Sequence, residues 1–365
     1  YTLQSGATFT SVSSYRGYDL DGFFEQDGTP SRLVNTGKVQ EQRQYSQEFR
    51  LASPTDGPVD WIGGLYYFNE KIDEQTRGAF FAFGVDTIAL ASVKGESVAG
   101  FGSVNFDVGD RSNATVGLRY TSDKRDFTGS AGYLGLAPAG IAPCLPPAGQ
   151  PFCPYTGASQ IKVPLPVAPS SSSDGTTAGD LTFNHRWTPA ISTYVKYARG
   201  YKGGGFVTNL ASTSLGDPVD PEYVDSFEVG YRSMLLDGRV RLNATAFYLD
   251  WKDRQVVDFD PVRVANVARN DKKATSSGAE FELTAQLSDA FSLDLNAALL
   301  DATIKEGFIT KPGVGQVSLN GKDTPYSPRA SAGGALQFRR AMSDALTVAV
   351  RGEVNWRDSY FLNSE

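Results

Sequence analysis

Short and long connections alternate along this chain with a regularity that few soluble folds require. Runs of alternating apolar and polar residues are joined in turn by tight segments, such as 53–58 and 341–344, and by segments of about twenty residues or more. In an up-and-down sheet, this alternation puts every tight turn at one end and every long loop at the other. The predicted strands are 7–20, 40–53, 59–72, 96–108, 113–126, 179–186, 190–201, 223–234, 239–252, 275–287, 291–304, 328–340 and 345–358.

The two faces of these strands differ in chemistry. Between residues 345 and 354, the even positions include Val348 and Val350, whereas the odd positions include Arg351 and Glu353. A soluble sheet with one wet face would also alternate, but many of these runs reach about twelve residues, against about five or six in soluble sheets. About nine to eleven tilted residues cross a bilayer, so the lengths favour a membrane-spanning sheet. We expect lipid contact for Val229, Tyr231, Phe281, Leu283, Val348 and Val350, and a place in the lumen for Arg119, Glu228, Glu280, Glu282, Arg351 and Glu353.

Aromatic residues and hydropathy agree with this interpretation. Tyr and Trp gather near the loop ends of strands, as at Tyr197 and Trp251, and a smaller set lies beside the short turns, as amphipathic rings at two membrane interfaces would. The mean hydropathy is −0.28, and no run approaches the roughly eighteen apolar residues of a transmembrane helix. A net charge of −7 disfavours a nucleic-acid partner. The predicted fold class is all-β: an antiparallel up-and-down transmembrane β-barrel, here an incomplete barrel of about 13 to 14 strands.

The segment 127–178 is rich in Gly, Pro and Ser and is predicted to be a long extracellular loop insertion that needs no regular structure. It contains both cysteines, Cys144 and Cys153, with no histidine nearby. Two isolated thiols at this spacing suit a loop disulfide better than a metal site, and they indicate an oxidising compartment. The loop could act as a mobile lid or simply as a tip with a local cross-link.

Catalytic constellations are absent from the sequence. The only histidine, His185, falls beside a short turn and is predicted to be structural. Acid pairs such as Glu280 and Glu282 have strand spacing on polar faces, which suits charge lining a wet lumen. The glycine-rich stretch 203–205 follows a strand and precedes no helix pattern, so it is not a phosphate-binding loop. The sequence predicts no enzyme, no metal and no cofactor.

Several diffuse motifs occur in order along nearly the whole chain: 45–53 followed by 61–67, the stretch 194–206 with its YKGGGF sequence, 221–230, 242–248, 278–282 and 325–329. Together they resemble the TonB-dependent receptors of Gram-negative outer membranes. The resemblance implies a barrel of about 22 strands, plugged by an N-terminal globular domain, that imports a scarce nutrient with energy from the TonB complex. This sequence departs from the pattern because it shows no plug, no TonB box and no closing strands. Residues 1–365 are therefore expected to be part of the barrel domain.

The resemblance also implies partners and a ligand. The expected partners are the TonB complex, through the missing plug region, outer-membrane lipid and a small-molecule ligand, with no nucleic acid. The YKGGGF stretch resembles receptors for ferric siderophores of the yersiniabactin type, so an iron chelate is the expected ligand, with glycan-derived or aromatic ligands as alternatives. A passive porin and a soluble extracellular glycan-binding protein are the other functions considered. We expect five cationic and aromatic residues to meet the ligand at the outer mouth: Arg16, Tyr201, Lys202, Phe206 and Arg254.

Overall fold

The computed structural model describes residues 1–25, 34–55, 57–80, 85–136, 161, 163–208, 215–260, 265–311 and 313–362. Cys144 and Cys153 lie outside these residues, so their disulfide remains a prediction. The strands are β1 (Thr8–Glu25), β2 (Val34–Ala52), β3 (Val59–Phe80), β4 (Val85–Asp107), β5 (Ser112–Leu136), β6 (Val163–Leu165), β7 (Ser170–Thr188), β8 (Ile191–Lys202), β9 (Gly205–Phe206), β10 (Pro218–Val219), β11 (Glu222–Leu235), β12 (Val240–Asp260), β13 (Ala265–Gln286), β14 (Phe291–Glu306), β15 (Phe308–Lys311), β16 (Gly315–Ser318), β17 (Ala330–Ser343) and β18 (Leu346–Arg357).

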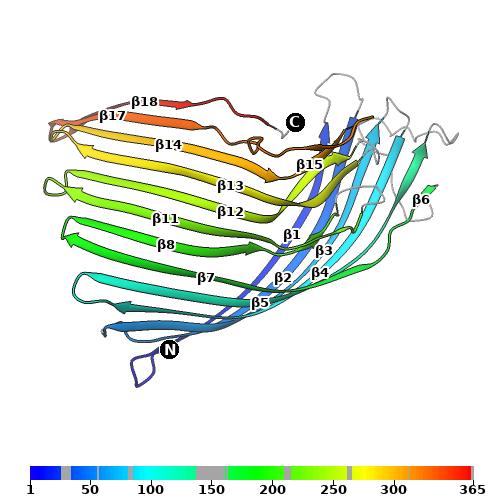
Figure 1. Ribbon diagram of the computed structural model, residues 1–365, viewed down its shortest axis with the longest axis horizontal. Helices are drawn as coiled ribbons and strands as arrows, with labels where there is room; N and C mark the ends of the chain where they lie inside the picture. The colour runs from blue at the N-terminus through cyan, green and yellow to red at the C-terminus, as the bar shows by residue number, and fades with distance from the viewer. Residues whose placement is uncertain are drawn as a thin grey trace.

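One antiparallel sheet of 14 strands holds nearly all of these elements, in the order β1-β2-β3-β4-β5-β7-β8-β11-β12-β13-β14-β17-β18, with β6 added beside β5. Every neighbour in this order is the next long strand along the chain, which confirms the predicted up-and-down topology. The tight turns share one end of the sheet and the longer connections share the other (Figure 1). In the 236–239 turn, Asp237 and Gly238 have φ values of 53° and 86°, the left-handed conformation that tight hairpin turns use.

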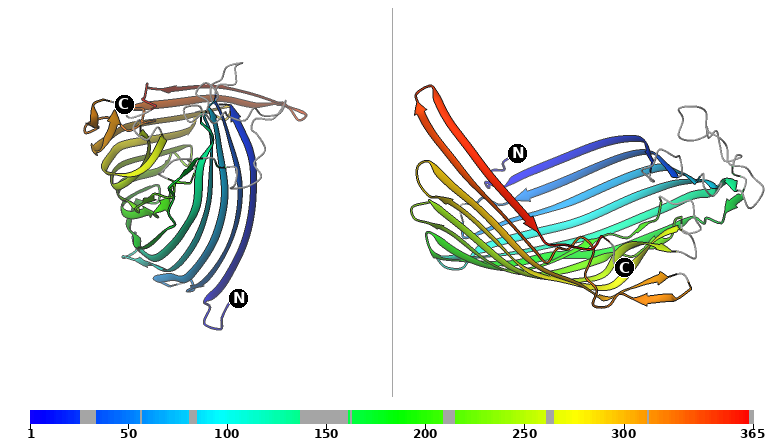
Figure 2. Two further views of the ribbon diagram at one scale, coloured as in Figure 1. Left: turned by 90° about the vertical axis from the view of Figure 1, so that its right-hand side faces the viewer. Right: turned by 90° about the horizontal axis from the view of Figure 1, so that it is seen from above.

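The sheet is strongly curved, and its first and last strands, β1 and β18, are not paired with each other (Figure 2). Side chains on the convex side of a curved sheet spread apart, whereas those on the concave side converge. On β3, the apolar residue Leu65 is 65% exposed, whereas its neighbour Tyr66, on the other face, is less exposed and half-buried. Arg119 of β5 reaches the ring of Tyr66, two strands away, with its guanidinium carbon 5.2 Å from the ring centroid. The apolar face is therefore convex and the polar face concave.

The strand register keeps each face continuous across the sheet. Residues directly opposite one another on neighbouring strands share a face, so Val229, Ala246, Ala279 and Leu299 form one convex row. The residues expected to contact lipid, which are Val229, Tyr231, Phe281, Leu283, Val348 and Val350, all lie on this face. Those expected in the lumen, which are Arg119, Glu228, Glu280, Glu282, Arg351 and Glu353, lie on the concave face.

The strands extend much further toward the loop end than the sequence patterns predicted. β3 ends at Phe80 rather than near residue 72, and only residues 81–84 separate it from β4. The expectation of an irregular loop over 127–178 is wrong at both of its ends, because β5 continues to Leu136 and pairs with β7 from Ser170 onward. In these extensions apolar residues such as Ile88 and Ala89 occupy both faces of the strand, so paired strands continue without the alternation that would reveal them.

Candidate functional site

The described residues between β8 and β11, 203–208 and 215–221, lie over the concave face near the loop end and are called the bridging segment below. Its short hairpin, β9 with β10, places Phe206 against Phe127 of β5, with ring centroids 5.7 Å apart. Phe127 is 1% exposed, and it packs with a small apolar cluster that also holds Ala89, Ala91 and Leu215. Since Leu215 comes from the far arm of the same segment, both arms of the hairpin cover the lumen side of β4 and β5.

Glycines allow this segment to approach the sheet closely. A Cβ on Gly204 would lie 2.7 Å from the carbonyl oxygen of Val219 and 2.9 Å from a carboxylate oxygen of Asp174. Gly216 has φ +83°, and a Cβ there would meet the ring of Phe127 at 2.2 Å. Gly203 and Gly204 of the YKGGGF stretch therefore allow close packing inside the mouth, whereas Gly205 has open space beside it.

Hydrogen bonds attach the same segment to the opposite side of the sheet. The Gln255 side-chain amide of β12 donates to the carbonyl oxygens of Gly203 and Asp220, at 3.0 and 2.9 Å. The Gln255 backbone N–H donates to a carboxylate oxygen of Glu222 at 2.6 Å. Asn270 of β13 accepts from the backbone N–H of Asp220 and donates to its carbonyl oxygen, both at 2.9 Å. The segment thus bridges β4 and β5 on one side to β12 and β13 on the other.

Charged groups of both signs surround this bridge. Asp123 of β5 and Asp174 of β7 lie directly opposite each other on the concave face. Burial raises the pKa of Asp174; Arg125 opposes the increase, and the carboxylates of Asp220 and Asp123 add to it. The Arg125 guanidinium lies beside Gly203, 3.0 Å from where a Cβ would be. The mouth can therefore offer cationic, acidic and aromatic groups to a solute.

The five predicted ligand residues do not form one cluster. Lys202 ends β8 on the concave face opposite Glu222, next to the bridging segment, and is exposed. Tyr201 points to the other face, because it shares the convex row with Tyr223. Phe206 packs on Phe127, and Arg16 lies in the middle of β1, six strands away from β8 in the sheet order.

Arg254 forms an ion pair within the protein. Its guanidinium pairs with Asp271 at 3.0 Å, and the two side chains are only 11% and 2% exposed. Gln255 and Arg125, which contact the bridging segment, were not foreseen. Their only signal in the sequence is their position near the loop ends of long strands, which many other polar residues share.

Toward the turn end, the concave face carries a network of paired charges and aromatics. Arg351 of β18 reaches Asp294 of β14 across β17, at 3.2 Å. The Tyr194 hydroxyl donates to Glu228 at 3.4 Å, and Arg232 lies 4.8 Å from the Tyr194 ring centroid. Such a face suits contact with water or a polar domain and does not suit contact with lipid.

His185 has partners near the turn end of the sheet. His185 shares a hydrogen bond of 2.8 Å with Ser112 and lies edge-on to Trp187, with ring centroids 4.4 Å apart, beside a short turn. Within the described ranges, no three His, Cys, Asp or Glu side chains come together as metal ligands. The same residues include no helix with the length and apolarity to cross a bilayer.

Comparison with solved structures shows a common fold. The ferric yersiniabactin uptake receptor from Yersinia pestis matches with a TM-score of 0.76 and 20% identity, over 100% of this chain and 49% of that one. The siderophore receptor PiuA from Acinetobacter baumannii matches with a TM-score of 0.65 and 15% identity, over 94% and 51%. The ferric citrate transporter FecA matches with a TM-score of 0.64 and 14% identity, over 98% and 47%. The chain thus spans about half the length of these structures.

Comparison by sequence gives the family. No curated protein sequence matches significantly. The family described as TonB dependent receptor-like, beta-barrel matches residues 1–365, which is the whole chain. The β-barrels of this family are outer-membrane proteins of Gram-negative bacteria. This chain belongs to the β-barrel family of the TonB-dependent receptors.

Proposed function

We propose that this chain is the barrel portion of an outer-membrane receptor that binds a ferric siderophore outside the cell and imports it with energy from the TonB complex. The observation that carries this proposal is the bridging segment, of which residues 203–208 and 215–221 are described: it places Phe206 over the concave face at the loop end, next to Lys202 and Arg125. Three structurally similar proteins are named as ferric yersiniabactin, siderophore and ferric citrate receptors or transporters, which favours an iron chelate as the substrate class. In this proposal the protein is a transporter without enzymatic activity.

The ligand would be held by cations on the concave side of the mouth. Lys202 is exposed there. Arg125 lies against Gly203, the residue that follows Lys202 in the sequence. Both can attract the negative charge of an iron chelate, and the partly exposed ring of Phe206 offers an apolar contact beside them. Arg254 is less suited to this role, because it neutralises the buried Asp271.

The test uses the full-length receptor and a panel of ferric hydroxamate, catecholate and citrate chelates. Replacing Lys202 and Arg125 together by alanine should weaken binding of the preferred chelate at least tenfold, about 1.4 kcal/mol. Tyr201→Ala is the matched control, because its side chain lies on the convex face next to Lys202 in sequence. Heat-modifiable migration on a gel checks that each variant still forms its barrel.

Four outcomes would contradict the proposal. An unchanged affinity in the double variant would move the site elsewhere, and an equal loss in Tyr201→Ala would show that the effect is not local to the concave face. Failure of every ferric chelate to bind would reject the substrate class. Uptake that persists after removal of TonB would reject the energy source.

A further inference from the structure

A hollow of about 470 Å³ lies on the convex apolar face, away from the mouth. Its floor is made of alanines on three neighbouring strands, Ala244 and Ala246 of β12, Ala279 of β13 and Ala297 of β14. Larger side chains flank the hollow: Val229 and Tyr231 on β11, Phe281 on β13 and Leu299 on β14. Small residues on several adjacent strands thus leave a furrow in a surface that bulky residues otherwise fill.

An aromatic row crosses the sheet just above this hollow, toward the loop end. The rings of Tyr197 and Phe227 lie 5.1 Å apart, and those of Phe227 and Tyr248 lie 6.5 Å apart. Phe227 and Tyr248 are each two residues from the top row of the hollow, formed by Val229 and Ala246. Aromatic residues favour the headgroup level of a bilayer, so this row marks the loop-side membrane interface.

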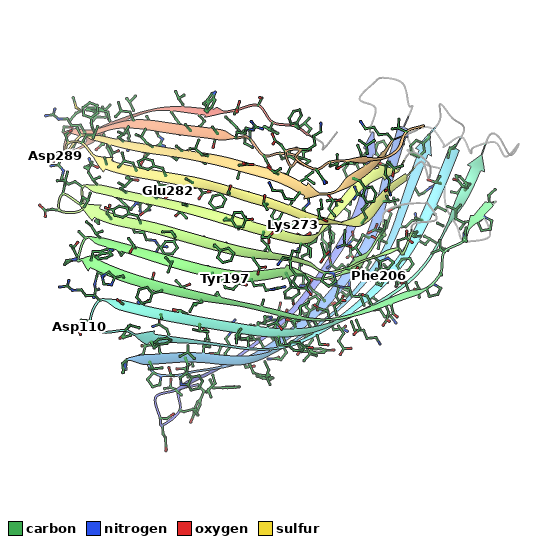
Figure 3. The ribbon with its side chains drawn as sticks, in the orientation of Figure 1. Asp110, Tyr197, Phe206, Lys273, Glu282 and Asp289 are labelled. Atoms are coloured by element: carbon green, nitrogen blue, oxygen red, sulfur yellow. The ribbon has the colours of Figure 1, made fainter. Side chains whose placement is uncertain are left out.

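Cations gather one further step toward the loop end. Arg199 and Lys252 pair with Asp225 at 3.8 and 3.1 Å, and Lys273 pairs with Asp250 at 3.4 Å. In Figure 3, Lys273 lies further toward the loop end than Tyr197. The cationic side chains are 39–45% exposed, whereas the two acids beneath them are 11% and 19% exposed. The acids therefore lie beneath the cations, and the cationic groups are the more exposed part of these ion pairs.

The spacing between the cations and the hollow fits a single lipid. Asp225 and Asp250, which mark the level of the three cationic head groups, are four residues above Val229 and Ala246. Four residues span about 13 Å along a strand, or about 10 Å along the membrane normal at a tilt of about 40°. One leaflet of hydrocarbon is about 15 Å thick, so a chain that starts at the cations passes the aromatic row and enters the hollow within one leaflet.

We infer that the convex face of β8 and β11–β14 binds an anionic, phosphate-bearing membrane lipid, with its phosphate on Arg199, Lys252 and Lys273 and an acyl chain in the alanine-floored hollow. Charge complementarity identifies the head group, and the apolar hollow below it identifies the tail. The site is separate from the mouth and holds a structural lipid, whatever solute the receptor imports.

Native mass spectrometry of the full-length receptor in detergent tests this inference with three probes: phosphatidic acid, diacylglycerol with the same acyl chains, and glycerol phosphate. Phosphatidic acid should bind at least tenfold more tightly than either of the others, because each of them lacks one half of the recognised structure. The double variant Lys252→Gln/Lys273→Gln and the single variant Ala246→Phe should each weaken phosphatidic acid binding at least tenfold.

Matched controls exist on the other wall of the barrel. Lys71 and Lys94 lie opposite each other on the convex face of β3 and β4, and Val116 is a convex, partly exposed residue of β5. Lys71→Gln/Lys94→Gln and Val116→Phe should leave binding unchanged. The inference fails if diacylglycerol binds as tightly as phosphatidic acid, if glycerol phosphate competes equally, or if the control variants lose as much binding as the site variants.

Discussion

At the scale of single residues, Gly204 and Gly205 are sequence neighbours with different surroundings. A Cβ on Gly204 would meet the Val219 carbonyl oxygen at 2.7 Å, whereas a Cβ on Gly205 would meet nothing within 4 Å. Gly204→Ala should therefore destabilise the docked segment by about 1–3 kcal/mol, as overpacking does, and Gly205→Ala by less than about 0.5 kcal/mol. Amide hydrogen exchange at Phe206 and Val207 in the full-length receptor measures the difference. Equal exchange in the two variants would show that the close approach is unimportant.

Asp174 gives the same segment a pH dependence. The pKa of Asp174 is higher in the folded state than in the unfolded state. The contribution of this carboxyl group to the stability of the docked segment is therefore complete below the unfolded pKa and is lost as the pH rises through the folded pKa. Asp174→Asn should thus slow exchange at Gly204 near neutral pH, by up to about fivefold, since like charges facing across strands cost about 0.2–1 kcal/mol. The difference from the wild type should vanish below about pH 4. A constant difference between pH 3 and pH 8 would argue against this role of the carboxyl group.

Side-chain orientation was easier to predict than side-chain partners. The six residues expected to face lipid lie on the convex face, but the prediction that Tyr201 meets the ligand did not apply the same alternation. Tyr201 is four residues from Tyr197 on one strand and therefore shares its convex face, away from the mouth. The pairing of Arg254 with Asp271 could not be foreseen in this way. It depends on the cross-strand register of β12 and β13 and on the φ of 53° at Asp253, neither of which has a clear signal in the sequence.

At the scale of elements, successive side chains of β18 face two different environments. Val350 is 62% exposed on the convex face, near the middle of the strand, and Thr347 lies on the opposite face. An arginine on the lipid face near the midplane costs about 2–4 kcal/mol, so Val350→Arg should lower the free energy of unfolding of the full-length barrel by that amount. Thr347→Arg should cost much less, because its side chain meets water. A denaturant titration in lipid vesicles compares them, and equal losses would mean that the face assignment is wrong.

The turn ends of the strands were predictable, and their loop ends were not. The predicted boundary at residue 291 coincides with the start of β14, and the one at 59 coincides with the start of β3, because tight turns contain polar residues between two alternating runs. At the loop end, β4 begins at Val85, eleven residues before the predicted start at 96. There the apolar residues of β4, such as Ile88 and Ala89, occupy both faces, so no period-two pattern marks the strand.

At the scale of the whole molecule, strand order followed from the sequence but the covering of the mouth did not. Consecutive strands pair with each other, so the order needed only the positions of the strands. Residues 203–208 and 215–221 instead cross to β4 and β5, through contacts such as Phe206 with Phe127. Those contacts join residues about eighty positions apart in the sequence, and no local pattern specifies them.

The last prediction concerns the two unpaired edges of the sheet, β1 and β18. In the described part of the chain, β1 pairs only with β2, and β18 only with β17. Each backbone group left unpaired in hydrocarbon costs several kcal/mol, so a sheet with two open edges should not persist in a bilayer. We expect residues 1–365, expressed alone and refolded in detergent, to migrate identically with and without heating. The full-length receptor should shift on heating, because its remaining strands can pair with β1 and β18. A heat-modifiable monomer of residues 1–365 alone would mean that β1 and β18 can close on each other, and that the open sheet is not the state these strands adopt in a membrane.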